Sequence, residues 1–210
     1  MEEQDIKAED KILQAASEIF IQKGLSGARM QEIADKAGIN KALLHYYYRT
    51  KDNLFESVFS MVLKKLIVPE VIKILQTEPD VFEMIKKFCM IYIDALNKNP
   101  FIPVFVLETL QKNQGRMPAI FAKAGLPVKE VLKTFEDAMD NGLIRRMDSK
   151  QLVINLISMC IFPIAGQHLI RPILFNDSKR DYKAFIEARK IEVPDFIIHS
   201  IKINNHEPQK

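Results

Sequence analysis

The stretch from residue 29 to residue 48, RMQEIADKAGINKALLHYYY, constrains the fold of this chain more than any other part of the sequence. In its first half, Ile33, Ala34 and, one turn later, Ala37 share an apolar face at helical spacing. Gly38 follows as the residue that can adopt a positive φ and reverse the chain direction. We therefore expect a short helix that ends in a tight turn.

The second half predicts another short helix. Asn40 is a good N-cap, because its side-chain oxygen can accept a hydrogen bond from a free amide of the next helix. Leu44 and Tyr48, four residues apart, give this helix an inward face. Two short helices joined at a steep angle form a helix-turn-helix, whose second helix fits a DNA major groove. The residues left on the outer or lateral faces are Lys41, Ala42, Leu43, His45, Tyr46 and Tyr47.

The alternative is a helical hairpin in a bundle that binds nothing. A solvated helix face is usually rich in Glu and Lys, whereas this one carries tyrosines, a histidine and flanking cations, which favour contact with phosphates and base edges. The net charge of +3 is weak evidence for DNA binding, since residues 1–60 hold more acidic than basic side chains. The prediction of DNA binding depends instead on where the cations lie, because they cluster around the helix-turn-helix motif. They are Arg29, Lys36, Lys41, Arg49 and Lys51.

The composition excludes several other classes of protein. A chain of 210 residues, 48% hydrophobic, can form one large or two modest domains with real cores. The acidic N-terminus does not resemble a signal peptide. The longest apolar run, 152–166, is interrupted by polar residues and Pro163, so we expect a buried helix and no membrane partner. Cys89 and Cys160 have no disulfide or metal spacing, and they fit a reducing cytoplasm.

Helical periodicity continues along the whole chain, and no strand or repeat stands out, so the predicted fold class is all-α. Expected helix caps are Thr50, Ser149 and either Asp177 or Ser178, and expected stops are Gly24 and Gly142. The helix after Thr50 is expected to bury Leu54, Phe55, Val58, Met61, Val62 and Leu66. The predicted helices span residues 8–23, 51 to a kink or end at Pro69, 81–97, 101–112, 114–126, 127–141, 149–169 with a kink at Pro163, and 178–202 as one helix kinked at Pro194.

About the first sixty residues resemble the DNA-binding domain of the TetR/AcrR family of bacterial transcriptional regulators. The combined motif is specific, although no single residue is. The sequence departs from the family pattern at Ala28, Arg29, Leu43, His45 and Tyr48, which bears on the operator sequence rather than on the fold. The residues that carry the resemblance are 12–20, Gly24, 31–34, 37–39, Lys41, Leu44, Tyr47, Tyr48, Lys51 and Leu54.

The resemblance implies an N-terminal three-helix helix-turn-helix DNA-binding domain and a larger helical domain for effector binding and dimerisation. We expect the first at residues 1–50, a connecting helix at 51–68, the second domain at 69–204 and a tail at 205–210. In the family, ligand binding moves the connecting helix as a lever and separates the two DNA-binding domains.

The outward residues of the second helix are the candidate DNA contacts. Lys41, Tyr47 and Lys51 match the phosphate-contacting positions of the family, and charge and place add Arg29. Leu43 could pack on a thymine methyl and His45 could bond to a purine edge. Tyr48 is expected to pack inside. The predicted DNA-binding residues are Arg29, Lys41, Tyr47 and Lys51 for phosphates, and Ala42, Leu43, His45 and Tyr46 for base edges.

The resemblance also implies a homodimer formed by the last two long helices, 149–169 and 178–202. One helix-turn-helix has a small footprint, and dimers bind palindromic half-sites about 34–36 Å apart. The helix at 149–169 is apolar nearly all round, which fits one face on the core and another on a partner.

A small-molecule effector is a further implication of the resemblance. An apolar lining with a few polar groups suits a hydrophobic or amphipathic ligand, and Asn155 and His168 are the polar residues expected to orient it. Core packing is the competing role for most of these residues. The candidate effector-binding residues are Phe88, Tyr92, Phe105, Phe121, Met139, Asn155, Met159, Phe162 and His168.

The sequence carries no motif of an enzyme. The sequence has no Gly-rich phosphate loop, nucleophile elbow or histidine pair at metal-ligand spacing, so we expect neither an enzyme nor a cofactor. A helix-turn-helix regulator controlled by a partner protein, without a small-molecule effector, stays open, and so does an activator. Repression is the usual outcome in the family.

Overall fold

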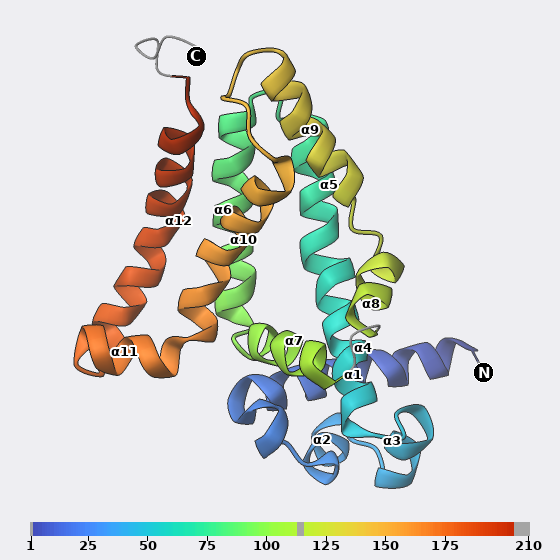
Figure 1. Ribbon diagram of the computed structural model, residues 1–210. Helices are drawn as coiled ribbons and strands as arrows, with labels where there is room; N and C mark the ends of the chain where they lie inside the picture. The colour runs from blue at the N-terminus through green and yellow to red at the C-terminus, as the bar shows by residue number, and fades with distance from the viewer. Residues whose placement is uncertain (1, 113–115, 204–210) are drawn as a thin grey trace. The chain divides into compact units, whose positions relative to one another are not determined.

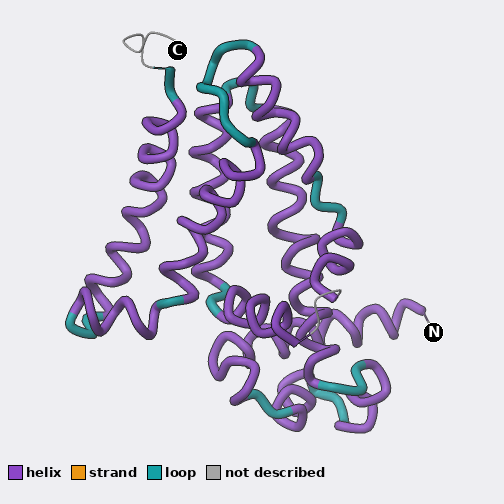
Figure 2. Tube along the Cα trace, viewed as in Figure 1, coloured by secondary structure: helices purple, strands orange, loops and turns teal. Residues whose placement is uncertain are grey.

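The computed structural model describes residues 2–112 and 116–203, without the side chains of residues 2–7, 105 and 108–117. Every secondary-structure element in this part of the chain is a helix (Figure 2). The predicted all-α fold is therefore confirmed.

The helices follow one another closely along the chain (Figure 1). Most predicted bounds agree within two residues, although α1 begins earlier than expected, and the predicted start of the helix at 114–126 lies outside the described residues. Gly24, with φ of 67°, interrupts α1 where the sequence predicts the helix to end. The elements are α1 (Glu2–Gly27), α2 (Met30–Ala37), α3 (Lys41–Tyr47), α4 (Lys51–Val62), a π-helix (Leu63–Ile67), α5 (Val68–Thr77), α6 (Val81–Lys98), α7 (Phe101–Lys112), α8 (Arg116–Ala124), α9 (Val128–Asp140), α10 (Ser149–Ala165), α11 (Gln167–Phe175) and α12 (Lys179–Ile201).

The chain forms two compact units. Unit 1 comprises residues 1–68 and 98–125, and unit 2 comprises residues 69–97 and 126–210. These units differ from the domains predicted on sequence grounds, because α7 and α8 belong with the N-terminal helices. The predicted tail at 205–210 lies outside the described residues.

An aromatic cluster explains why α7 and α8 belong to unit 1. The rings of Phe20 and Phe55 lie 4.8 Å apart, and Phe101 of α7 contacts Phe55 edge-on at 5.3 Å. Phe121 of α8 makes a similar edge contact with Phe59 at 5.7 Å. Aromatic rings contribute large buried areas to a core, so these contacts hold segments distant in sequence in one unit.

The π-helix between α4 and α5 changes which side chains of this continuous helical segment point inward. Pro69 has no N–H to offer the carbonyl four residues earlier, and its ring would crowd that carbonyl in a regular helix. The wider π turn accommodates this, with Val68 N–H bonded to the Leu63 carbonyl, five residues back. Leu63 and Ile67 are consequently buried, whereas Leu66 is 45% exposed. The prediction that Leu66 points inward is wrong for this reason.

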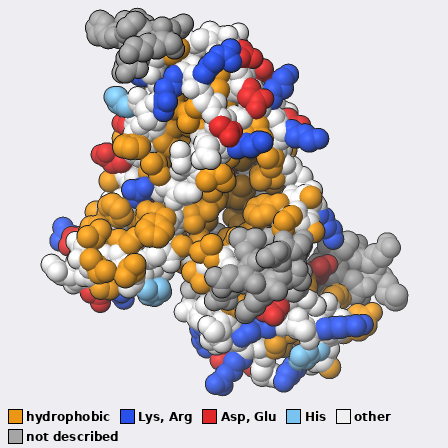
Figure 3. All heavy atoms as spheres, viewed as in Figure 1, with side chains coloured by type: hydrophobic (Ala, Val, Ile, Leu, Met, Phe, Trp, Pro, Cys, Tyr) orange, Lys and Arg blue, Asp and Glu red, His pale blue; other side chains and the backbone are white. Residues whose placement is uncertain are grey.

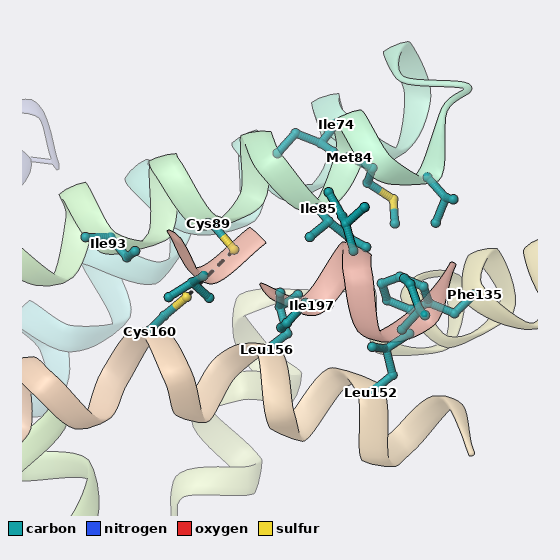
Figure 4. Close-up of a cluster of buried hydrophobic side chains, with 14 of the residues drawn as sticks. Ile74, Met84, Ile85, Cys89, Ile93, Phe135, Leu152, Leu156, Cys160 and Ile197 are labelled. Carbon is teal, nitrogen blue, oxygen red and sulfur yellow. Dashed lines mark hydrogen bonds between the residues drawn. The ribbon is translucent and has the colours of Figure 1, made fainter. Parts of the chain in front are cut away.

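The core of unit 2 joins α6, α9, α10 and α12 (Figure 4). Ile85 and Ile93 of α6 and Phe135 of α9 are almost completely buried. Cys89 of α6 and Cys160 of α10 are both buried, with their Sγ atoms 4.0 Å apart. The hydrogen bond that Cys89 shares with Cys160, together with burial, raises the pKa of the Cys89 thiol far above its ordinary value. Both cysteines are buried, so they act here as core residues.

The long apolar helix predicted at 149–169 begins at residue 149 as expected, but it is two helices and its N-cap is a different residue from the predicted one. Asp148, not Ser149, caps α10 by accepting a hydrogen bond from an N–H of the first turn at 2.8 Å. The chain then bends by 75° between α10 and α11, around Gly166. A Cβ at Gly166 would lie 3.1 Å from the Phe162 carbonyl oxygen, so the tight bend favours glycine. No single helix among residues 2–112 and 116–203 has the length and hydropathy to span a membrane, and only α10 and α11 taken together pass that test.

Two side chains of α12 satisfy carbonyls that the end of α10 leaves without helical partners. Pro163 has no N–H to bond to the Met159 carbonyl, and Arg189 donates a hydrogen bond to that oxygen at 2.6 Å. The hydroxyl of Tyr182 donates to the Pro163 carbonyl in the same way. Because buried carbonyls need partners, these bonds fix α12 against α10.

Candidate functional site

The turn between α2 and α3 is built from backbone hydrogen bonds at the end of α2. Gly38 has φ of 69° and ψ of 33°, the left-handed conformation. Its N–H bonds to the Asp35 carbonyl at 3.2 Å, and Ile39 N–H bonds to the Ala34 carbonyl at 3.0 Å, which is the Schellman pattern of a helix end. A Cβ at Gly38 would meet no atom within 4 Å, so the positive φ alone favours glycine.

The inward side of α3 is fixed by one cap and two buried side chains, as the sequence predicts. The Asn40 side chain accepts a hydrogen bond from Leu43 N–H at 2.7 Å. Leu44 is fully buried and Tyr48 is 5% exposed. The Tyr48 hydroxyl donates to Glu9 of α1 at 3.0 Å, and burial, with the Glu9 carboxylate, raises the pKa of Tyr48 well above its ordinary value. The position of α3 is therefore anchored in the core of unit 1.

The opposite side of α3 is presented to solvent. Tyr46 is 80% exposed, and its ring meets the half-buried Tyr47 edge-on at 5.6 Å. In the view of Figure 3, Lys and Arg side chains gather over α2 and α3. This side combines cations, aromatic rings and small side chains, the kinds of group that meet phosphates and base edges. The other predicted contacts on α3 are exposed at Lys41, Ala42 and His45 and half-buried at Leu43.

Two ion pairs brace α2 against α1. Lys36 contacts Glu18 at 2.8 Å, and Lys23 contacts Glu32 at 3.0 Å. The hydrogen bond from Lys23 lowers the pKa of the Glu32 carboxyl. Exposed pairs of this kind add little stability each, but these two lie near opposite ends of α2 and resist its rotation. Lys36 is thus held by α1.

Lys51 and Arg29 occupy different positions from the α3 residues. The Lys51 ammonium donates to the Ala28 carbonyl at 3.0 Å and to the Ser26 carbonyl at 3.3 Å, so it holds the junction of α1 and α2. An ammonium has three donors, and its predicted contact with a phosphate stays a prediction. Arg29 is exposed at the N-cap position of α2, where its side chain makes no capping hydrogen bond.

The eight candidate effector-binding residues whose side chains the structure describes are divided between the two units. Phe88 and Tyr92 stack with ring centroids 5.1 Å apart in unit 2, and Met139 is buried in the same core. Phe121 lies in unit 1. Their role in effector binding stays a prediction. The remaining members are Asn155, Phe162 and His168, which are exposed in the single chain, Met159, which is half-buried, and Phe105, whose side chain lies outside the described residues.

Unit 2 contains an apolar cavity of about 280 Å³ between α5, α6, α9 and α10. Among the predicted effector residues whose side chains the structure describes, only Phe88 lines it. Val131, Leu132 and Phe135 of α9 line it too. Apolar residues at helical spacing look the same in a sequence whether they form a cavity wall or a packed core. The lining residues are Val71, Ile74, Leu75, Met84, Ile85, Phe88, Leu126, Val128, Val131, Leu132, Phe135, Val153, Ile154, Leu156 and Ile157.

Known proteins share both the motif and the fold. The family model for bacterial regulatory proteins, tetR family, matches residues 12–58. The HTH-type transcriptional repressor NicS of Pseudomonas putida is 23% identical over 189 residues, 86% of this chain and 89% of NicS. The regulator RutR of Escherichia coli is 27% identical over 162 residues, 76% of this chain and 66% of RutR. The solved structure of HlyIIR, a hemolysin II transcriptional regulator, superposes with a TM-score of 0.61 at 20% identity and covers 94% of this chain and 98% of its own.

An exposed recognition helix after a Schellman turn, in a segment that matches the family model, defines a helix-turn-helix DNA-binding transcriptional regulator. The curated relatives are regulators and not enzymes. Residues 12–58 carry the DNA-binding segment of tetR-family bacterial regulatory proteins, and the curated relatives that match most of the chain are transcriptional regulators.

Proposed function

We propose that this regulator is a repressor that binds a palindromic operator as a homodimer, and that a small apolar molecule bound in unit 2 releases it. The observation that carries the proposal is the presentation of α3: Leu44 is fully buried beneath it while Tyr46 is 80% exposed above it. A helix held in this way can enter a major groove without rearranging. Such a repressor acts in the cytoplasm, where its DNA lies.

The proposed DNA-contacting residues on and beside α3 have two different roles. Lys41 and Tyr47 contact phosphates on either side of the groove, supported by Arg29 and Lys51. Ala42, Leu43, His45 and Tyr46 contact base edges, because they lie along the exposed or half-buried surface of the helix. Phosphate contacts position the protein, and base contacts select the sequence.

Selection of bound DNA from a random pool, with the full chain, tests the proposed operator. The expected product is a palindrome with half-sites one or more helical turns apart. Lys41→Ala removes one phosphate contact from each protomer of the dimer, so it should weaken binding to all sequences and reduce the salt slope by about 1.8. Lys123→Ala on α8 removes the same charge from an exposed position and should change neither. A selected pool without symmetry would contradict the dimeric operator, and an unchanged salt slope for Lys41→Ala would contradict the phosphate contact.

The proposed dimer uses α10 and α12. Phe162 of α10 is 60% exposed in the single chain, and Ile191 and Phe196 of α12 are 66% and 63% exposed. Exposed apolar patches of this kind mark interaction surfaces, and in Figure 3 further hydrophobic side chains gather over α11 and the adjacent ends of α10 and α12. Phe196→Asp should convert the dimer to a monomer in light scattering, whereas Leu143→Asp, also at an exposed apolar residue but outside these helices, should not. A Phe196→Asp dimer would contradict this interface.

The proposed release uses residues 51–68 as a lever. The helical chain runs from α4 through the π-helix into α5 without an intervening loop, and α5 supplies Val71, Ile74 and Leu75 to the cavity. A ligand that displaces α5 would thus act on the helix that begins directly after the helix-turn-helix.

A reporter gene behind the selected operator tests whether the protein represses or activates. The gene should be transcribed less when the protein is present. More transcription would identify an activator instead.

A further inference from the structure

We infer that the cavity of unit 2 takes an uncharged hydrocarbon of about ten to twelve carbon atoms, such as a bicyclic aromatic compound or a terpene-sized molecule, and that it rejects a charged compound with the same carbon skeleton. The inference deepens the proposed effector site, and it rests on the proposed function only where the ligand is said to control DNA binding. It concerns the chemistry of the ligand, which the lining residues and the cavity volume define.

The lining offers a ligand no polar side chain. All lining residues are Val, Ile, Leu, Met or Phe, and the helical backbone behind them uses its own polar groups in helix hydrogen bonds. The two polar residues expected to orient an effector, Asn155 and His168, are exposed and do not line the cavity. A carboxylate or ammonium that entered would lose its water without gaining a partner.

Two cations of α12, Lys190 and Arg189, are engaged with other groups of unit 2. Lys190 of α12 contacts Asp94 of α6 at 2.5 Å and Glu187 at 2.6 Å, and the partly buried Arg189 donates to the Met159 carbonyl. None of these residues lines the cavity. A ligand charge would therefore meet no opposite charge there, and the electrostatics favour a neutral molecule.

The volume limits the size of the ligand. A dry cavity of about 150 Å³ with similar walls binds benzene, so in proportion the 280 Å³ cavity here accommodates nearly twice as many carbon atoms. It lies just below the range of about 300–1,000 Å³ that is typical of drug-sized sites. A long acyl chain or a bulky cofactor would exceed it.

The cavity has an entrance, which an internal packing defect would lack. Ile154 of α10 and Val128 at the start of α9 both line it, yet they are 58% and 49% exposed. Apolar side chains that are both wall and surface mark the rim of an opening. A hydrocarbon can enter past them, and its binding would remove exposed apolar surface from water.

Binding of naphthalene and of 2-naphthoate to the purified full-length protein tests the inference. The two probes share one bicyclic skeleton and differ by a carboxylate. The chain has no tryptophan, so the fluorescence of either probe can be followed directly. Naphthalene at about ten times its Kd should raise Tm by about 3–5 °C. 2-Naphthoate should bind at least about 100-fold more weakly, because its charge finds no partner in the cavity.

Two variants locate the probe. Ile157→Phe fills part of the cavity from α10 and should weaken naphthalene binding at least about tenfold. Leu143→Phe adds the same ring at an exposed residue outside the lining and should leave binding unchanged. If Ile157→Phe does not fold, Val131→Leu makes a smaller change in the same wall, with a smaller loss expected.

The outcomes separate this inference from the proposed function. Equal or tighter binding of 2-naphthoate would overturn the ligand class, and so would the absence of naphthalene binding. Undiminished binding by a folded cavity variant would overturn the site. All of these measurements are made without DNA. Failure of the unliganded protein to select an operator would instead refute the proposed regulator and leave the hydrocarbon site standing.

Discussion

The helix-turn-helix segment, residues 29–50, and the cavity of unit 2 are built in opposite ways. In the segment, hydrogen bonds between residues three to five positions apart form the turn and caps, as between Ile39 and Ala34 or Leu43 and Asn40. The cavity is formed by four helices whose contributing residues extend from Val71 to Ile157. The first can be recognised in a short window of sequence, whereas the second exists only when distant helices pack.

The comparison also separates two uses of apolar side chains. Under α3, Leu44 and Tyr48 are buried so that polar and aromatic residues face outward in a fixed arrangement. Around the cavity, apolar residues leave a space unfilled, which interiors usually avoid because close packing is favourable. A space that persists in an apolar core is a candidate binding site for a small ligand. A helix surface whose side chains are held in a fixed, exposed arrangement is a candidate binding site for a macromolecule.

The largest expected effect is on the anchoring of α3. Leu44→Ala should lower the free energy of unfolding by about 3 kcal/mol, because it empties a fully buried position, and should abolish operator binding. Denaturant unfolding followed by circular dichroism measures the loss. Leu143→Ala, at a residue 52% exposed, is the control and should change little. A loss of stability without a loss of DNA binding would show that α3 does not depend on this anchor.

The next effect tests long-range packing in unit 2. Arg189→Met should cost about 2 kcal/mol, since the Met159 carbonyl loses a charged donor at 2.6 Å. Urea unfolding measures it, and operator binding by the folded variant should be preserved. Arg189→Lys keeps a donor and should recover part of the loss. Equal losses for the two variants would argue that the planar guanidinium, including its contact with Phe185 at 5.5 Å, matters more than the hydrogen bond.

A smaller effect is expected at the turn between α2 and α3. Gly38→Ala should cost about 1–2 kcal/mol, because alanine at φ of 69° is strained although its Cβ meets no atom. Gly38→Asn should cost less, since asparagine tolerates this conformation better. Thermal unfolding of both variants measures the difference. Equal losses of stability for Gly38→Ala and Gly38→Asn would show that backbone strain at this residue does not determine the stability of the turn.

The smallest effect is expected from the hydroxyl of Tyr48. Tyr48→Phe removes its bond to Glu9 and should cost about 0.5–1 kcal/mol. The pKa of Tyr48 is raised in the folded protein, so the folded state holds the phenol proton more tightly. Its contribution is present below the ordinary pKa of about 10 and is lost as pH rises above it. The difference between parent and variant in urea unfolding should therefore shrink above about pH 10, and a difference that grows would contradict the assignment.

The elements that the sequence predicted well are those set by local chemistry. Gly24 interrupts α1 where the sequence predicts its end, and Asn40, Thr50 and Ser178 cap their helices as predicted. Ser149 shows the limit of this approach. It neighbours the true cap, Asp148, and is instead buried with its hydroxyl bonded to Glu136 at 2.8 Å, a contact between helices that no local pattern encodes.

The sequence by itself determined the class of protein, because periodicity, capping residues and one glycine at a tight turn act within a few residues of each other. Tertiary structure decided which side of a helix faces inward after a π turn, as at Leu66, and where an apolar run bends, as at Gly166. It also decided which of many apolar side chains line a space and which fill one. These properties depend on how the surfaces of distant helices pack together. That packing is set by the shapes and volumes of side chains that meet in three dimensions, and the spacing of residues along the chain does not specify which side chains meet.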